Sequence, residues 1–172
     1  MSIIFETKLL KIGPLQVIRI PLESSEKLPS RGMVMVQGTI NNIPFKEPLE
    51  PDGEGSHWIE VSTLLSKEAE VSVNETVFLE IEASDEWIEP AIPSDIMDAI
   101  IKSDVSNQWN SVTTKAKWEW IRWIRSTINP ETRNRRIEVA CSKLQKGNKR
   151  PCCFDTSRCT VTDVSKSGVL LD

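Results

Sequence analysis

Residues 118–136 read WEWIRWIRSTINPETRNRR and contain three tryptophans and five arginines around a short break between two helical segments. Asn129 can cap a helix, Pro130 fits its first turn, and Glu131 places an acid near its positive end. A helix is therefore predicted to begin at residues 129–130, directly after the break. With the segment before the break, it is predicted to form a helical hairpin.

Amphipathic spacing extends this hairpin in both directions. Thr113 or Thr114 can cap the first helix, and Gly147 is suited to end the second. The apolar stripe of the first helix comprises Ile121, Ile124 and Ile128, with Trp120 beside it. The i, i+3, i+4, i+7 face of the second helix comprises Ile137, Ala140, Cys141 and Leu144. An earlier helix is predicted to start at Pro93 and Ser94.

The N-terminal half has the pattern of short strands. Six β-branched runs are separated by turn-forming residues, at 3–9, 15–20, 33–40, 43–46, 57–61 and 75–82. Asn41 and Asn42 fit a two-residue hairpin turn, because asparagine tolerates the left-handed conformation that such turns require. Six such strands favour a small closed or partly closed barrel, with residues 62–69 as a short helix across one end.

These elements predict an α+β protein with an N-terminal small β-barrel packed against a C-terminal helical hairpin and an irregular tail. The predicted domains are residues 1–90 for the barrel and residues 91–172 for the helices and tail. A chain of 172 residues can bury one good core, or two small lobes that share an interface. A short strand is predicted in the closing GVLL at residues 168–171.

Charge is distributed unevenly beneath the formal net charge of −4. Residues 113–158 carry twelve Lys/Arg and four Asp/Glu, whereas the rest of the chain carries nine and twenty-one. This asymmetry is typical of an anion-binding lobe, and equally of two lobes that attract each other. The sequence has no signal-peptide pattern and no membrane-length apolar window, so a cytoplasmic protein is predicted.

Three segments carry a resemblance to a known family. They are PFKEPLEPDGEGSHWIEV at 44–61, IPSDIMDAI at 92–100, and WIRWI at 120–124 followed by NPETRNRRIEVACSKLQKGNKRPCCF at 129–154. The second half resembles the bacteriocin-protection, YdeI/OmpD-associated family. The first half resembles a small uncharacterised β-barrel domain that often precedes it and is similar in fold to double-split barrels. The resemblance implies a role in tolerance of antimicrobial peptides, without an established enzymatic activity.

Arg133 and Arg136 are candidate binding residues, with Thr132 beside them. They lie at the edge of the apolar face of the second helix and are expected to face inward. Cations near a helix start oppose its dipole, so a negative partner is expected. One alternative is a carboxylate among Glu86, Glu89 and Asp95. The other is a small external anion held by the arginines and the N–H groups of the helix start.

Trp118 and Trp123 are further candidates. Tryptophan beside arginine can stack on nucleic-acid bases. The simpler interpretation is that the indoles pack where the hairpin meets the barrel, and the acidic overall composition disfavours nucleic acid as a partner. Trp120 is expected in the core, and Trp118 or Trp123 is expected to be partly exposed.

His57 is the single histidine of the chain and lies in the loop PDGEGSHW. Its ordinary pKa is near neutrality, so a general base, if there is one, would be His57. Ser56 is a poor partner because adjacent residues of a strand point apart. The expected arrangement is an exposed loop histidine.

The four cysteines lie within nineteen residues of one another. Cys141 falls on the apolar helix face and is expected to be buried. The weak candidates for a zinc site are Cys152, Cys153 and Cys159, whose spacing is unusual for structural zinc. Lys149 and Arg150 can lower the pKa of a neighbouring thiol, which leaves open a redox role for the pair at 152–153. The alternative is that this segment packs the tail onto the helices. We predict no metal and no cofactor.

Two classes of function stay open. In the first, a non-enzymatic interaction protein, acting in stress or antimicrobial-peptide tolerance, binds a small anion or a peptide with the barrel and the tryptophan–arginine hairpin. In the second, an enzyme, or a protein that binds an anion, a nucleotide or nucleic acid, uses the basic C-terminal lobe and His57. The first class is the preferred prediction.

Overall fold

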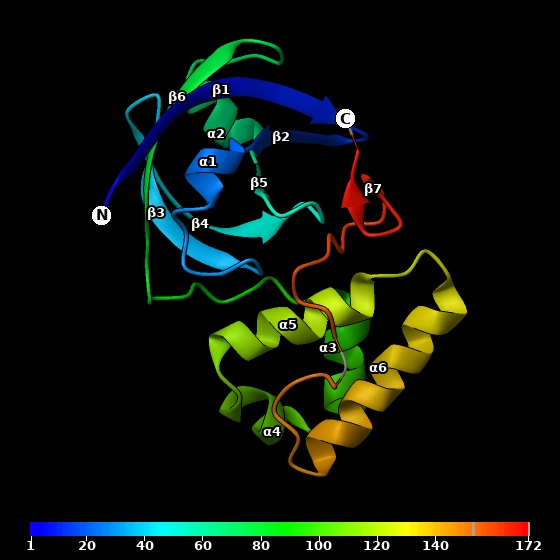
Figure 1. Ribbon diagram of the computed structural model, residues 1–172. Coiled ribbons are helices and arrows are strands. Elements are labelled where there is room, and N and C mark those ends of the chain that lie inside the picture. Colours follow the sequence, from blue (N-terminus) through cyan, green and yellow to red (C-terminus); the bar gives the residue numbers. More distant parts are fainter. Residues whose placement is uncertain (153, 172) are drawn as a thin grey trace. The chain divides into compact units, whose positions relative to one another are not determined.

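A computed structural model describes residues 1–152 and 154–171 and confirms the α+β class (Figure 1). The chain divides into two compact units, which are described separately. The barrel unit comprises Met1–Trp87, Thr156–Cys159 and Asp163–Asp172. The helical unit comprises Ile88–Asp155 and Thr160–Thr162. The sequence analysis placed the boundary at residue 90 and the whole tail with the helices, whereas most of the tail groups here with the barrel.

Six antiparallel strands close the barrel in the order β1-β2-β5-β4-β3-β6 (Figure 1). Their bounds are β1 Ile3–Ile12, β2 Leu15–Arg19, β3 Val34–Ile40, β4 Ile43–Pro51, β5 His57–Glu60 and β6 Thr76–Ala83. The long strand β1 pairs with β6 through its first half and with β2 through its second half. Because β1 pairs with both β2 and β6, it joins the two ends of the strand order and closes the sheet into a barrel.

Residue alternation directs one face of each strand into the barrel. Val77, Leu79 and Ile81 of β6 are at most 1% exposed, whereas Phe78 between them is 41% exposed. The predicted turn is confirmed, because Asn41 and Asn42 join β3 to β4 with positive φ angles of 47° and 68°. Apolar residues of all six strands form a single core.

Two short helices accompany the strands. The predicted one is α2, Thr63–Glu68, which the Ser62 side chain caps by accepting a hydrogen bond from the Leu65 N–H. The other is α1, Leu22–Ser25, which the sequence analysis missed. It is a single turn without a side-chain cap, so neither periodicity nor capping chemistry could reveal it.

The helical unit contains α3 Ser94–Lys102, α4 Ser106–Ser111, α5 Thr114–Arg125 and α6 Pro130–Gln145 (Figure 1). The predicted caps are confirmed: the Thr113 hydroxyl accepts from the Ala116 N–H, and Asn129 caps α6. Trp120 is fully buried and belongs to this unit's core. Ile128 is 83% exposed, so its assignment to the apolar stripe was wrong, because α5 ends at Arg125.

The tail folds onto the barrel unit as a small hairpin of β7 Ser165–Lys166 and β8 Val169–Leu170. Leu170 donates its N–H to the Asp52 carbonyl at 2.7 Å, and its own carbonyl accepts from Arg19 Nη2 at 2.7 Å. The closing strand predicted at residues 168–171 is thus present. Within the described part of the chain, no helix combines the length and apolar character needed to cross a membrane.

Candidate functional site

Trp123 and Arg136 meet between α5 and α6. Arg136 Nη1 donates to the Trp123 carbonyl at 2.9 Å and to the Ser126 hydroxyl at 2.8 Å. Its guanidinium carbon lies 5.7 Å from the centre of the Trp123 ring, within cation–π range. The Trp120 and Trp123 rings pack in a T-shaped arrangement, with centroids 6.0 Å apart. Arg136 therefore fixes the turn after α5 and leaves Trp123 partly exposed beside it.

Arg133 pairs with Asp95 in a two-pronged ion pair. Arg133 Nε lies 2.7 Å from Asp95 Oδ2, and Arg133 Nη2 lies 2.9 Å from Asp95 Oδ1. The hydrogen bonds from Arg133 hold the pKa of Asp95 below its usual range, and the same bonds raise the pKa of Arg133. Asp95 is one of the three expected carboxylates, and it comes from α3 rather than from the barrel. The pair therefore joins α3 to α6 within the helical unit.

The amides at the start of α6 already have protein partners. Asn129 Oδ1 accepts from the Glu131 N–H at 2.9 Å and from the Thr132 N–H at 3.4 Å. The Asn129 carbonyl accepts from the Arg133 N–H at 3.0 Å. An external anion at this helix start would have to displace the asparagine cap and compete with Asp95 for Arg133. The described contacts thus favour the internal carboxylate over the external anion.

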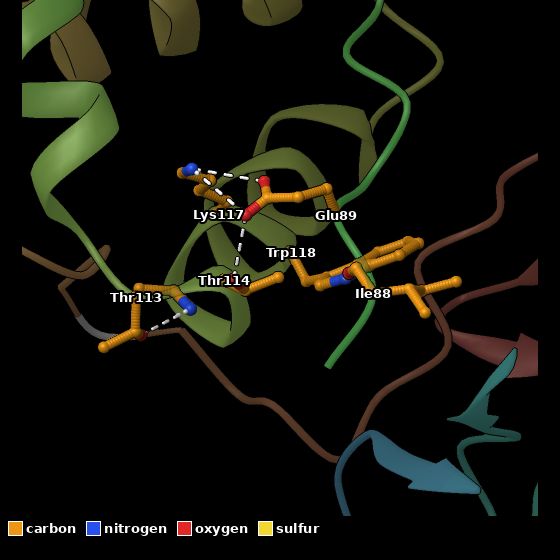
Figure 2. A network of polar contacts seen from close by, with 7 residues as sticks. Ile88, Glu89, Thr113, Thr114, Lys117 and Trp118 are labelled. Carbon is orange, nitrogen blue, oxygen red and sulfur yellow. Dashed lines mark hydrogen bonds and ion pairs between the residues drawn. The ribbon is translucent and has the colours of Figure 1, made fainter. Parts of the chain in front are cut away.

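Trp118 belongs to a different polar network at the other end of α5 (Figure 2). Its Nε1–H donates to the Ile88 carbonyl at 2.9 Å. Glu89 accepts from Lys117 Nζ at 3.2 Å and from the Thr114 hydroxyl at 3.0 Å. The hydrogen bond from Lys117, with that from Thr114, lowers the pKa of Glu89. These contacts fasten residues 88–89 to the first turns of α5 (Figure 2).

Trp118 and Trp123 do not form one surface. They are five residues apart on α5, which places them about 140° apart around the helix axis. Trp118 is engaged with Ile88, and Trp123 with Arg136. Within the helical unit, Trp123, Arg136 and the Arg133–Asp95 pair thus connect α3, α5 and α6, whereas Trp118 contacts the segment before α3. His57 belongs to the barrel unit.

His57 is fully buried, so the expectation of an exposed loop histidine was wrong. Its Nδ1 lies 2.6 Å from the Ser25 hydroxyl, and its Nε2 lies 2.8 Å from the Gly32 carbonyl. The preceding loop is folded tightly by Asp52, whose Oδ1 accepts from the Glu54 and Ser56 N–H groups. His57 is consequently the first residue of β5 rather than part of the loop.

Ser25 is the polar partner that the sequence analysis missed. It lies on the unpredicted helix α1, and no motif connects it with His57. Ser56, considered as a partner, instead donates its hydroxyl to the Ile20 carbonyl at 2.7 Å. Arg31 completes the cluster by donating from Nη1 to the Ser25 hydroxyl at 3.2 Å and from Nη2 to the Ser25 carbonyl at 2.6 Å.

The hydrogen bonds define the tautomer of the neutral His57 ring. The Gly32 carbonyl can only accept, so Nε2 carries the proton, and in the neutral ring Nδ1 accepts from the Ser25 hydroxyl. Burial lowers the pKa of His57, and the nearby Arg31 cation lowers it further, against the opposing effect of the Gly32 carbonyl. The pair has the spacing of a nucleophile and its base, yet both residues are 0% exposed. As described, it stabilises the barrel rather than contacting solvent.

His57 is expected to make the free energy of unfolding depend on pH. Its pKa in the folded protein is lowered, so the unfolded chain binds a proton more readily below about pH 6.5. The stabilisation is present in full above that pH and is lost as the pH falls towards the folded pKa. Urea unfolding from about pH 7.5 to about pH 5.5, above most carboxyl titration, should show this decline.

His57→Gln should flatten the pH dependence in this interval. Ser25→Ala is the matched control, since it removes the same hydrogen bond but keeps the titrating ring. If the glutamine variant declines as steeply as the wild type, His57 is not the group responsible.

Among the described cysteines, Cys141 and Cys159 are buried and Cys152 is exposed. Cys153, named with Cys152 and Cys159 as a weak zinc candidate, lies outside the described residues. Across residues 1–152 and 154–171, no three His, Cys, Asp or Glu side chains are grouped as a metal site would require.

Comparison with known families finds a match in each of the two units. Residues 5–81 match the model of a domain of unknown function, DUF1905, and residues 89–147 match the model described as Bacteriocin-protection, YdeI or OmpD-Associated. The chain is thus similar to each family over a different part of its length. The DUF1905 match spans most of the six barrel strands, and the YdeI/OmpD-associated match spans α3 to α6. The resemblance expected from the sequence is therefore confirmed. Comparison with curated proteins finds no match.

Proposed function

We propose that this protein is a non-enzymatic protection protein that binds a cationic antimicrobial peptide and withholds it from its target. The observation that carries the proposal is the family match of residues 89–147, whose description names bacteriocin protection. The charge of the barrel unit supports a cationic partner, because residues 1–87 contain fifteen Asp/Glu and seven Lys/Arg.

The polar clusters support a binding role over a catalytic one. Ser25 and His57 are both fully buried. His57 already hydrogen-bonds to the Gly32 carbonyl, and the Ser25 hydroxyl already accepts from Arg31. A general base must come within hydrogen-bond distance of the proton that it removes from a substrate. A pair at zero exposure does not offer that approach in the folded protein.

A peptide also fits better than the small anion considered from the sequence. Asp95 already neutralises Arg133, and Asn129 already holds the first amides of α6. An anion would gain little from donors that have protein partners. A cationic peptide needs carboxylates, and the barrel strands present several exposed ones, including Glu6 and Glu80.

Growth protection and direct binding together test this proposal. Expression of the chain in a peptide-sensitive bacterium should raise the peptide concentration needed to stop growth. Equilibrium dialysis of the purified protein should retain a synthetic helical peptide of leucine and lysine, KLLKLLKKLLKLLK. The same peptide with every lysine replaced by glutamine is the control and should pass freely.

Two results would contradict the proposal. One is protection or retention that does not distinguish the lysine peptide from its glutamine control. The other is a failure to bind the lysine peptide; salt-dependent binding of an oligonucleotide would then favour the nucleic-acid alternative.

A further inference from the structure

The outward face of β1, β6 and β3 combines exposed apolar side chains with carboxylates. These strands are neighbours in the barrel (Figure 1). We infer that this face is the docking surface for a cationic amphipathic peptide, an inference that rests on the proposed function. We call it the β1–β6–β3 face and define it by Ile4, Glu6, Gln37, Thr39, Phe78, Glu80 and Glu82.

Strand register places these side chains in adjacent rows. Ile4 of β1 and Thr39 of β3 lie on either side of Glu80 of β6. In the next row Glu6 lies opposite Phe78. In the row on the other side of Glu80, Gln37 lies opposite Glu82 and donates to its carboxylate at 2.9 Å. Side chains in neighbouring rows on one face point the same way, so apolar and acidic groups alternate across a continuous surface.

Two large apolar side chains of this face are left in water. Ile4 is 58% exposed and Phe78 is 41% exposed. They occupy adjacent rows of paired strands, and a carboxylate lies directly opposite each of them. Burying such side chains against a partner is favourable in proportion to the apolar area removed from water. This supplies the apolar half of the proposed recognition.

A hollow lies where β3 and β6 adjoin on this face. It is lined by Gly38, Glu80, Glu82 and neighbouring residues and has a volume of about 200 Å³. Glu80 and Glu82 are two residues apart on a strand, so their side chains are separated by about 7 Å. Lysines one turn apart on a helix are about 5–6 Å apart at Cβ and carry flexible stems. Two such ammonium groups can therefore reach both carboxylates.

Charge selects the kind of partner. The face presents the carboxylates of Glu6, Glu80 and Glu82, while nearby Lys46 is paired with Glu86 at 3.3 Å. Lys8 lies one row beyond Glu6, opposite Thr76, at the margin of the face. A second copy of this chain would bring like charges together across the surface, and an acidic ligand would meet the same repulsion. A peptide with lysines flanking leucines satisfies both the carboxylates and the apolar pair.

Matched charge variants test the surface with labelled KLLKLLKKLLKLLK and fluorescence anisotropy. Glu80→Gln/Glu82→Gln should weaken binding by about tenfold, as two exposed charge pairs allow. Glu23→Gln/Glu26→Gln removes two exposed carboxylates near α1 and should weaken it by less than about twofold. Ile4→Ser/Phe78→Ser should also weaken binding by several fold, which long-range charge attraction alone would not produce. Thermal unfolding should confirm that every variant is folded.

The outcomes separate this inference from the proposed function. If the wild type binds the peptide and both glutamine pairs weaken it equally, or the serine pair has no effect, the β1–β6–β3 face is not the docking surface. The proposed function then stands with its site elsewhere. If the wild type does not bind the peptide, the proposed function fails and the surface loses its assigned partner.

Discussion

Gly38→Ala is expected to lower the free energy of unfolding by about 3 kcal/mol or more, or to prevent the barrel from folding. Gly38 of β3 lies opposite Ile81 of β6. A Cβ atom at this position would overlap the Glu80 carbonyl oxygen and lie 2.9 Å from the Ile81 Cα atom. These are backbone atoms of the partner strand, so no rotation of a side chain can relieve the overlap.

Relief would require β3 and β6 to separate, and closure of the barrel opposes that movement. The pairing of β3 with β6 extends over five residue pairs from Val36 to Ile40. Urea unfolding followed by circular dichroism should measure the loss, and soluble yield should report a failure to fold.

Thr39→Ala is the control because it changes the next residue of the same strand without adding an atom. A Gly38→Ala protein as stable as the Thr39→Ala protein would mean that β3 and β6 tolerate a wider spacing than described.

Local sequence signals predicted the elements whose chemistry lies within a few residues. Asn41 and Asn42 supply the turn conformation themselves, and Asn129 with Pro130 defines the start of α6. The β-branched run at 75–82, which forms β6, is an equally local signal. Each of these predictions was confirmed, because the interactions that determine the element are near in sequence.

Contacts between distant residues explain what the sequence did not reveal. His57 is buried by Ser25 and Gly32, which are 32 and 25 residues away. The loop before it has the composition of an exposed turn, so composition predicted the wrong environment. Among the candidate binding residues, the helix-dipole argument anticipated a negative partner for Arg133 and left open a carboxylate or an external anion. It could not select Asp95 from three candidates, since that choice depends on the packing of α3 against α6.

The tail illustrates the same limit of local patterns. Residues 156–159 and 163–171 follow both family matches, yet they group with the barrel. Three barrel glycines approach this tail closely. Gly13 lies against Asp163 and Val164, Gly32 against Thr156, and Gly53 against Gly168 and Val169. A glycine leaves room for a distant segment without indicating which segment will occupy that room.

Gly53→Ala is expected to release the tail from the barrel, at a cost of about 3 kcal/mol. Gly53 has a φ of +87°, and its added Cβ would overlap the Gly168 carbonyl oxygen and lie 2.9 Å from the Val169 Cα. Displacing residues 168–169 would break the neighbouring hydrogen bonds of Leu170 with Asp52 and Arg19. Limited trypsin digestion should then cut sooner after Lys166, with mass spectrometry to identify the site.

Gly55→Ala is the matched control in the same loop. Gly55 has a similar φ of +94°, but an added Cβ would meet nothing within 4 Å. Both substitutions therefore carry the backbone strain of a left-handed residue, about 1 kcal/mol, and only Gly53→Ala adds the collision with the tail. The difference between the two unfolding free energies isolates the contribution of tail docking. Equal losses, with equal rates of cleavage after Lys166, would mean that the close approach at Gly53 does not hold the tail in place.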